Sequence, residues 1–394
     1  MKFCCFNQRC MFIEIPTSIE TKLVDLRKTL HRHPELSGKE FQTASRIKKF
    51  LWELHGFQIT EKVGGNGLIA VFDSGVPGPS VLLRCDMDAL PIQESNDFAH
   101  RSVNDGVAHK CGHDGHMAVM AGVAAMLSAN PISKGKIALL FQPEEENGRG
   151  AERVLNDEFF QAFKPDWVFA MHNLPGFKES AVVSREGCFA SASQGLIVKL
   201  FGATSHAAHP EQGRSPEKVV SGLLTGLCEL PYIPNIYDDF CLVTIIHARM
   251  GERAFGTTPE EAVVMATLRS YLDSDMNLLT KEVEKLVKNL CDRFNIEYEI
   301  EYTEIYPATN NDKQAHQMVM NAAKANGLEL LEIHEPFRWS EDFGRFTQKY
   351  PGAVFGIGVG ENHPGLHNND YDFNDKIIPK AVAVFMNIIK QVHG

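Results

Sequence analysis

Short apolar runs, several of which lead directly into acidic residues or histidine, restrict the fold of this sequence more than any other feature. The runs cover residues 68–72, 81–85, 137–141, 167–171 and 353–356. Runs of this length without polar alternation are typical of β-strands that are buried on both faces. A helical apolar repeat over residues 117–127 lies between the second and third runs. The alternation predicts an α/β sheet with helices packed against it.

Two further helices are predicted ahead of these strands. Thr17 and Glu20 have the spacing of a capping box, and apolar residues at helical spacing continue from there to His31. A second apolar repeat begins at Phe41, continues to residue 54 and stops at Gly56.

A second domain is expected, because 394 residues exceed what one compact core usually needs. From residue 195 the pattern changes to strand 196–201, helix 216–230, strand 241–246, strand 262–268, helix 276–294 and strand 296–302. This order, β-α-β-β-α-β, is that of a ferredoxin-like unit. We therefore expect a ferredoxin-like α+β domain over residues 183–305, inserted into a first α/β domain made of residues 1–182 and 306–394.

Charge and cysteine content narrow the classes of function. The formal net charge is -11, with no long block of either sign, which argues against a nucleic-acid or membrane partner and favours a small substrate. Nine scattered cysteines, an odd number, suit a reducing compartment, so the expected location is the cytoplasm. The first ten residues lack the apolar stretch of a signal peptide, no run reaches membrane-spanning length, and Met11 is an alternative start.

Polar residues concentrate where the predicted strands end. Asp86 and Asp88 follow the run 81–85, the glutamates 144–146 follow the run 137–141, and His172 follows the run 167–171. Ligands of open α/β sheets bind outside the carboxyl ends of the strands. We therefore expect these side chains to converge on one patch of surface.

The segment 111–116 adds a thiol and two imidazoles at the start of a predicted helix, with Cys111 and His113 in the leading positions. A helix N-terminus and a metal ion would together favour the thiolate form of the cysteine. Sulfur, imidazole and carboxylate together suit zinc or another late divalent ion, and manganese is tolerated where carboxylate and imidazole predominate.

Each of these features has a simpler interpretation when taken alone. A buried cysteine is usually an apolar filler, and a run of three glutamates is usually a solvated face. Asp86 and Asp88 could be turn or helix-cap acceptors, and His172 and His367 could be core histidines with satisfied hydrogen bonds. The functional interpretation rests on the joint occurrence of these residues.

Six motifs in the expected order resemble the aminoacylase and carboxypeptidase metallohydrolases, in particular the branch of hippurate hydrolases and auxin-conjugate amidohydrolases. The motifs are residues 30–36, 86–91, 111–116, 142–146, 205–207 and 367–373, and the likeness extends over nearly the whole chain from about residue 18. The resemblance implies a three-layer α/β catalytic domain of the phosphorylase/hydrolase-like kind. It also implies that the inserted ferredoxin-like domain serves as a lid and for dimerisation, so that the protein is a homodimer.

The resemblance also implies roles for particular residues. It implies that Glu145 is the general base, that Asp86 and Asp88 orient ligands, and that two divalent ions, zinc or manganese with cobalt as an alternative, are bound by Cys111, His113, Glu146, His172 and His367. A metal-bound water would be acidic enough to give hydroxide near neutral pH, and the nearby carboxylate would move its proton.

Two residues of the predicted inserted domain complete the implied site. His206 resembles a catalytic histidine that related enzymes often supply from the partner subunit, although a loop histidine that caps or is solvated remains an alternative. Arg269 resembles an arginine that holds the substrate carboxylate, for which a bidentate guanidinium is suited.

The implied activity is hydrolysis of an N-acyl-L-amino acid, of the hippurate or N-acetyl kind, to a carboxylate and a free amino acid. A dipeptidase or carboxypeptidase with the same metals is the alternative enzyme, and a metal-binding or interaction protein that has lost catalysis is a third class. Retention of Glu145 beside Glu146 argues against that third class, because ion storage needs no base.

The sequence departs from the family pattern in two places. Residues 255–259 read Phe-Gly-Thr-Thr-Pro where many members have an Asn before a Val-Ile-Pro-like turn, so a polar substrate contact is expected to be missing. Asn147 and Arg149 stand in a stretch that is usually rich in glycine, and they are expected to reshape that loop.

Overall fold

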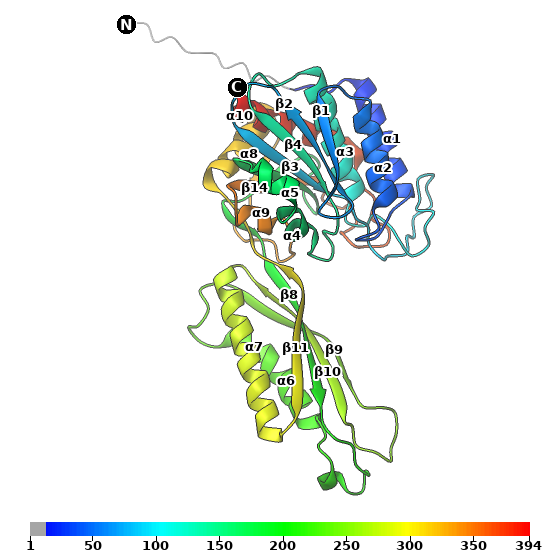
Figure 1. The fold of residues 1–394 in the computed structure, drawn as a ribbon, viewed down its shortest axis with the longest axis vertical. Helices are drawn as coiled ribbons and strands as arrows, with labels where there is room; N and C mark the ends of the chain where they lie inside the picture. Colours follow the sequence, from blue (N-terminus) through cyan, green and yellow to red (C-terminus); the bar gives the residue numbers. More distant parts are fainter. Residues whose placement is uncertain (1–12) are drawn as a thin grey trace. The chain divides into compact units, whose positions relative to one another are not determined.

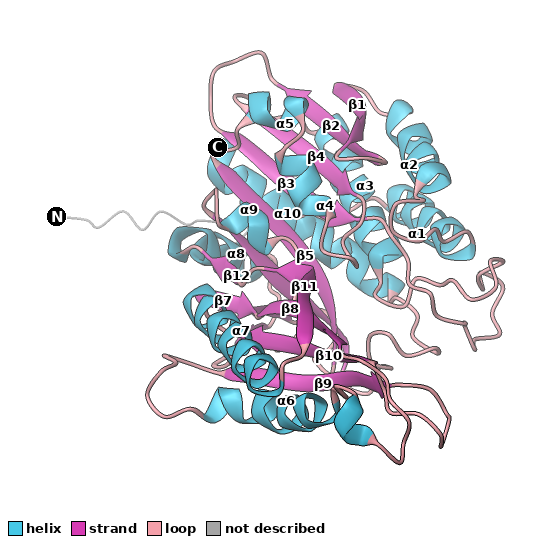
Figure 2. Cartoon of the chain, turned by 60° about the horizontal axis from the view of Figure 1, so that its bottom comes forward, coloured by secondary structure: helices cyan, strands magenta, loops and turns pink. Residues whose placement is uncertain are grey.

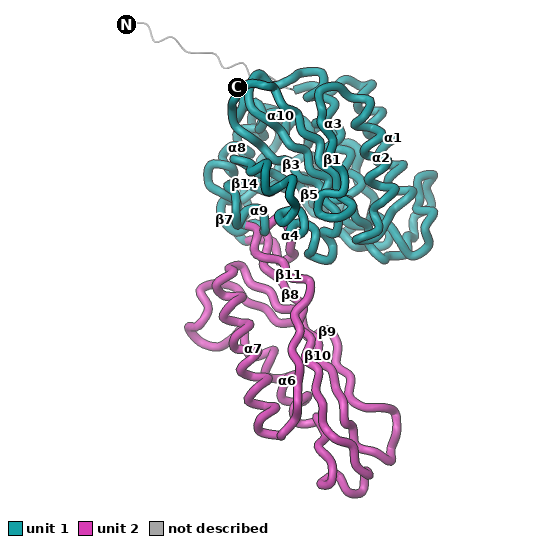
Figure 3. The backbone as a smooth tube through the Cα atoms, viewed as in Figure 1, with its two compact units in different colours: residues 1–189, 310–335, 345–394 teal, residues 190–309, 336–344 magenta. Residues whose placement is uncertain are grey.

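The computed structural model describes residues 13–394 and divides them into two compact units, which Figure 3 shows in separate colours. Unit 1 extends to Phe189 and also contains residues 310–335 and 345–394, whereas unit 2 contains residues 190–309 and 336–344. The expectations for residues 1–10 and for Met11 as a start lie outside the described residues. Within the described part of the chain, no helix combines the length and apolar character that crossing a bilayer requires.

A mixed eight-stranded sheet forms the centre of unit 1, in the order β1-β2-β4-β3-β5-β14-β6-β13 (Figure 2). Its strands are β1 (Phe57–Val63), β2 (Gly67–Asp73), β3 (Ser80–Asp86), β4 (Lys136–Gln142), β5 (Trp167–Pro175), β6 (Val182–Ser184), β13 (Leu330–Glu332) and β14 (Gly352–Gly360). The four neighbours β4, β3, β5 and β14 run parallel. These strands carry the apolar runs and are buried almost throughout, as expected for parallel strands with both faces covered.

Long helices and the sheet enclose one continuous apolar core (Figure 1). They are α1 (Thr17–Arg32), α2 (Phe41–Trp52), α3 (His113–Ala129), α8 (Lys313–Ala325) and α10 (Ile378–His393). Helix α3 is buried from His113 to Leu127 and packs against α1, α2 and α10. Gly115 lets the Phe373 ring approach, since a Cβ at this position would lie 2.2 Å from the ring.

Shorter elements complete unit 1 and its connections to unit 2. They are α4 (Gly150–Leu155), α5 (Glu158–Phe163), α9 (Gly344–Thr347) and the strands β7 (Gly187–Ala190) and β12 (Thr309–Asn311), which pair with each other. The rings of Phe160 in α5 and Phe346 in α9 meet edge to face, with centroids 5.6 Å apart.

Unit 2 contains an antiparallel four-stranded sheet and two helices. The elements follow in the order β8 (Ala192–Phe201), α6 (Glu217–Glu229), β9 (Cys241–Met250), β10 (Glu261–Ser270), α7 (Asp273–Phe294) and β11 (Glu297–Tyr306). The strands lie in the order β11-β8-β10-β9. The predicted β-α-β-β-α-β unit, and with it the predicted fold class, is confirmed.

The limits of unit 2 differ from the expected range of 183–305, because unit 2 also contains the distant segment 336–344. Hydrogen bonds hold this segment: Ser191 N donates to the carbonyls of Phe337 and Trp339, and Arg269 Nη1 donates to Arg338 O at 2.6 Å. No local pattern in the sequence predicts such a return.

Several elements differ from the sequence-based expectation. Pro16, not Thr17, is the N-cap of α1, and no side chain caps the helix. The capping-box prediction is therefore wrong, because Thr17 already lies within the helix. Strand β1 and the helices α8 and α10 were not predicted, although α10 contributes much of the apolar core.

Candidate metal centre

Three parallel strands and one helix bring the predicted residues of unit 1 together. Strands β4, β3 and β5 are neighbours, so their carboxyl ends share one edge of the sheet, and α3 begins there at His113. Cys111 Sγ lies 3.6 Å from His172 Nε2, and His113 Nε2 lies 3.7 Å from Glu146 Oε1. Further contacts of the same patch join His113 Nε2 to Glu145 Oε2 at 3.9 Å and His367 Nε2 to Glu146 Oε2 at 3.9 Å.

The five predicted ligands form two groups of three that share one sulfur atom. The first group is Cys111, His113 and His172, the second is Cys111, Glu146 and His367, and within each group the ligand atoms lie within 4.8 Å of one another. Sulfur, imidazole and carboxylate in groups of three suit late divalent ions. The arrangement fits two divalent ions, which these five residues would hold.

The two buried imidazoles are oriented by backbone carbonyls. His113 Nδ1 lies 2.8 Å from Asp88 O, and His172 Nδ1 lies 2.8 Å from Asn173 O. Because a carbonyl only accepts hydrogen bonds, Nδ1 is the donor in each ring, and Nε2 of the neutral ring keeps its lone pair. Both Nε2 atoms are therefore prepared as metal ligands.

Electrostatics support the same assignment. His113 Nε2 and Glu146 Oε1 are buried and have no hydrogen-bond partner among the described residues. Burial raises the pKa of Glu146 to about 8; nearby His113 opposes this shift, whereas the carboxylates of Asp88 and Asp86 add to it. Burial and then the charge of Glu146 raise the pKa of the Cys111 thiol well above its usual range. A divalent cation would favour the ionised forms of both groups, so the residues present fit a metal.

Asp88 holds the turn that carries the two glutamates. Its carboxylate accepts from Glu145 N at 3.1 Å, from Glu146 N at 3.0 Å and from Ser37 Oγ at 2.7 Å. The turn needs such support, because Glu144 has a φ of 55°, a left-handed conformation that costs a non-glycine residue about 1–3 kcal/mol. By accepting hydrogen bonds from this turn, the Asp88 carboxylate also fixes the main chain of Glu145 and Glu146. A role as turn acceptor and a role as orienting group are therefore compatible.

Asp86 contacts two side chains, His116 and Arg84, for which the sequence predicted no role. His116 Nδ1 is 2.6 Å from one carboxylate oxygen of Asp86, and Arg84 Nη1 donates to the other at 2.8 Å. The opposite side of the His116 ring contacts Asn173 Oδ1. His116 was visible in the motif 111–116, but its spacing alone does not distinguish a metal ligand from a residue that positions Asp86.

His367 differs from the other four predicted ligands. It lies in the loop after β14, its side chain is 53% exposed and its φ is 65°. Its backbone N–H donates to Lys110 O at 2.8 Å, which ties this loop to the residue before Cys111.

A buried network of charged side chains surrounds Asp114, the second residue of α3. His31 Nδ1 is 2.9 Å from Asp114 Oδ2, and His31 Nε2 is 2.9 Å from Glu94 Oε1. Burial by itself would lower the pKa of His31, but the bonds to the two carboxylates raise it to about 9. Arg27 extends the network by donating to Asp372 Oδ1 at 2.6 Å.

This network makes a prediction for the pH dependence of stability. The pKa of folded His31, about 9, exceeds the ordinary value of 6.5, so the charged ring stabilises the fold fully below pH 6.5 and loses this contribution as the pH rises to about 9. We expect the difference in free energy of unfolding between wild type and His31→Asn to shrink over this range in denaturant titrations. A difference that stays constant there would show that the ring does not titrate in this range.

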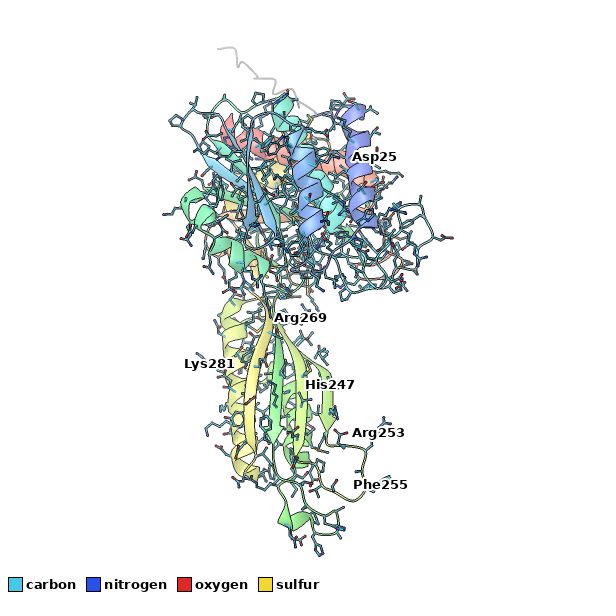
Figure 4. The ribbon with its side chains drawn as sticks, turned by 45° about the vertical axis from the view of Figure 1, so that its right-hand side comes forward. Asp25, His247, Arg253, Phe255, Arg269 and Lys281 are labelled. Atoms are coloured by element: carbon cyan, nitrogen blue, oxygen red, sulfur yellow. The ribbon has the colours of Figure 1, made fainter. Side chains whose placement is uncertain are left out.

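The two predicted residues of unit 2 have clear local environments. His206 is exposed, and its Nδ1 accepts from Ala208 N at 3.1 Å. Arg269 lies near the end of β10 (Figure 4). Its Nη1 donates to Arg338 O at 2.6 Å and to Ser340 Oγ at 3.0 Å.

The two departures from the family pattern also have local structures. Asn147 Nδ2 donates to Glu144 Oε1 at 3.2 Å, and its own Oδ1 accepts from Arg149 N at 3.1 Å, so Asn147 braces the loop that carries the glutamates. Phe255 is fully exposed in the loop between β9 and β10 (Figure 4).

Comparison with known proteins matches both the motifs and the fold. The model of peptidase family M20/M25/M40 matches residues 82–391. Hippurate hydrolase of Campylobacter jejuni is 31% identical over 92% of this chain and 94% of its own length. Bacillus subtilis YhaA, which is named as an amidohydrolase, is 30% identical over 92% of each chain.

A solved structure has the same fold. The YXEP protein of Bacillus subtilis, described as a dinuclear metal binding peptidase from the M20 family, has a TM-score of 0.81 at 24% identity and covers 96% of this chain and 99% of its own. The resemblance seen in the motifs is confirmed, and so is the class of enzyme, a metal-dependent amidohydrolase like hippurate hydrolase. The chain belongs to peptidase family M20/M25/M40.

Proposed function

We propose that the protein hydrolyses the amide bond of N-acyl-L-amino acids, of the hippurate or N-acetyl kind, with two divalent ions held by Cys111, His113, Glu146, His172 and His367. The observation that carries the proposal is the pair of ligand groups that share Cys111, with Glu145 Oε2 3.9 Å from His113 Nε2. The hippurate hydrolase of Campylobacter jejuni supports the substrate class.

The bound ions would polarise the scissile carbonyl and would lower the pKa of a bound water molecule towards neutrality. Glu145 would take a proton from the attacking water and return it to the leaving amine. Its position suits this task, since its backbone N–H is held by Asp88 and its side chain is 7% exposed. Asp88 thereby fixes the base and, through the carbonyl that accepts from His113, one metal ligand as well.

His206 and Arg269 are proposed as a catalytic and a carboxylate-binding residue, respectively. A guanidinium can bind a carboxylate through two parallel hydrogen bonds, which a neutral side chain cannot replace. Arg269→Gln is expected to raise KM for an N-acyl amino acid more than it lowers kcat. His206→Ala is expected to act mainly on kcat.

We also propose that the protein is a homodimer that uses unit 2. Strand β9 is an edge strand of its sheet, and Ile246 in it is exposed. Figure 4 shows His247 on the same strand. An unpaired edge with exposed apolar residues favours pairing with another chain. Light scattering of the purified protein tests this proposal.

The cytoplasmic location stays a prediction.

The proposed function is tested by a turnover screen. Protein reconstituted separately with zinc, manganese and cobalt is offered N-acetyl and N-benzoyl amino acids and, as a contrast, dipeptides with a free α-amine. Release of free amino acid from the acylated compounds, with loss of activity after chelation, is expected. Turnover of the dipeptides alone would favour the dipeptidase alternative, and turnover of none would contradict the proposal.

A further inference from the structure

Lys110, the residue directly before Cys111, has a completely buried side chain. Its ammonium donates to Glu94 Oε1 at 2.6 Å, Asn96 Oδ1 at 2.9 Å and the carbonyl of Tyr371 at 2.7 Å. A lysine ammonium has three donors, and here each has an acceptor. The side chain is therefore fixed in one place.

The main chain of Lys110 reaches the same distant loop as its side chain. His367 N donates to Lys110 O at 2.8 Å, while Lys110 Nζ donates to Tyr371 O. The loop that carries His367 is thus held from both ends by one residue. Cys111 and His367, which share the second ligand group, come from segments far apart in the chain, and Lys110 joins these segments.

Two features indicate that His367 depends on this support. Its φ of 65° is one that a non-glycine residue adopts only when its surroundings enforce it. Its half-exposed ring has little packing of its own, in contrast to the buried rings of His113 and His172. The ring is therefore placed by the loop that carries it, which Lys110 holds through its carbonyl at His367 N and through its ammonium at Tyr371 O.

The segment 94–96 strengthens the connection. Ser95 N donates to Asn369 O at 3.0 Å, and Asn96 Nδ2 donates to Asp370 O at 2.9 Å. The Glu94 carboxylate that pairs with Lys110 is itself held by His31 and by Ser102 N. The positive charge of Lys110 is thus balanced by a buried carboxylate that is itself held in place, as a buried ammonium requires.

We propose that Lys110 is a positioning residue that holds His367 against Cys111 and Glu146, and that it thereby sets the affinity for the ion of this second ligand group. The inference rests on the two-ion site of the proposed function but not on its substrate. Loss of a residue that orients a metal ligand typically weakens metal binding by about 10–100-fold.

The test is the replacement Lys110→Met, which keeps an unbranched apolar stem and the main-chain bond to His367 N but removes the three side-chain donors, among them the one that holds Tyr371 O. Binding of cobalt to chelator-treated protein is measured by competition with a chelator and by the absorption of the cobalt–thiolate bond. We expect one of the two ions to bind about 10–100-fold more weakly and the other to bind nearly as in wild type. Lys178→Met is the matched control, since Lys178 forms an exposed 2.6 Å pair with Glu329 in the same unit.

A double-mutant cycle separates positioning from a general effect on the fold. If Lys110 acts through His367, Lys110→Met has almost no further effect on metal affinity in a His367→Ala background. The variant Lys110→Met/Glu94→Gln removes the carboxylate charge that Lys110→Met leaves behind, and the same selective loss is expected for it if the single variant folds poorly.

Equal weakening of both ions, unchanged affinity, or a full effect of Lys110→Met in the His367→Ala background would each overturn the positioning role. Failure of the proposed function shows elsewhere, in the turnover screen of the wild-type enzyme. An active wild type that binds two ions, together with an unaffected Lys110→Met, would therefore refute only the role of Lys110.

Discussion

Glu145→Gln is expected to abolish measurable turnover of N-acyl amino acids while the protein keeps its metal. Glutamine retains the shape of the side chain but cannot accept a proton, and general acid–base groups typically contribute about 10²–10⁴-fold to a rate. Glu145 also lies within reach of His113 and Glu146, but elemental analysis should give the same metal content as in wild type, because each of the two groups that share Cys111 offers three ligand atoms without it. The measurement pairs kcat with metal content on the same sample.

Glu144→Gln is the matched control for this prediction. Glu144 lies in the same acidic run, but its carboxylate pairs with Arg153 and accepts from Asn147, so it points to a different set of partners. We expect kcat of this variant to stay close to that of wild type. Unchanged hydrolysis by Glu145→Gln would remove the assigned role, and metal loss in that variant would identify Glu145 as a ligand instead.

Cys111→Ala is expected to have the largest effect on metal binding. Its sulfur is common to both ligand groups, so its removal leaves each group with two ligand atoms. The affinity for both ions should fall by more than the roughly 10–100-fold that is typical for residues that only orient ligands. Turnover should fall with metal content, as measured by elemental analysis after dialysis against a chelator.

Cys291→Ala serves as the control for Cys111→Ala, because Cys291 is also a buried free thiol but lies on α7 in unit 2. We expect this control to lose some stability, as removal of a small buried group usually does, without loss of metal. Full metal occupancy in Cys111→Ala would exclude the cysteine from the site.

The apolar runs predicted the central parallel strands because their pattern is local and strong. The apolar pattern did not predict β1, where only Val63 is buried and the other residues are half-buried or exposed, or α10, whose start carries no side-chain cap. The capping box at Thr17 shows the converse error, since the right residue types were present but the helix begins one residue earlier than the pattern requires.

Part of the candidate site could be predicted from the sequence because of the topology of the sheet. Neighbouring parallel strands end at the same edge, so acidic residues and histidine after β3, β4 and along β5 were bound to converge. The roles of Glu145, His206, Arg269 and the five ligands remain predictions. These residues were identified by their resemblance to family motifs. For those in unit 1, the structure adds distances and hydrogen-bond partners.

By itself, the sequence determined the α/β class, the ferredoxin-like succession of elements in unit 2 and the residue types available at the strand ends, because periodicity and the succession of elements can be read from neighbours along the chain. Only the tertiary structure decided which partners these residues meet. The return of segment 336–344 to unit 2, the contact of Asp86 with His116, and the hold of Lys110 on the loop of His367 all join residues that are distant in sequence. Such contacts leave no local pattern, since hydrogen bonds between buried groups are set by the packing of whole elements.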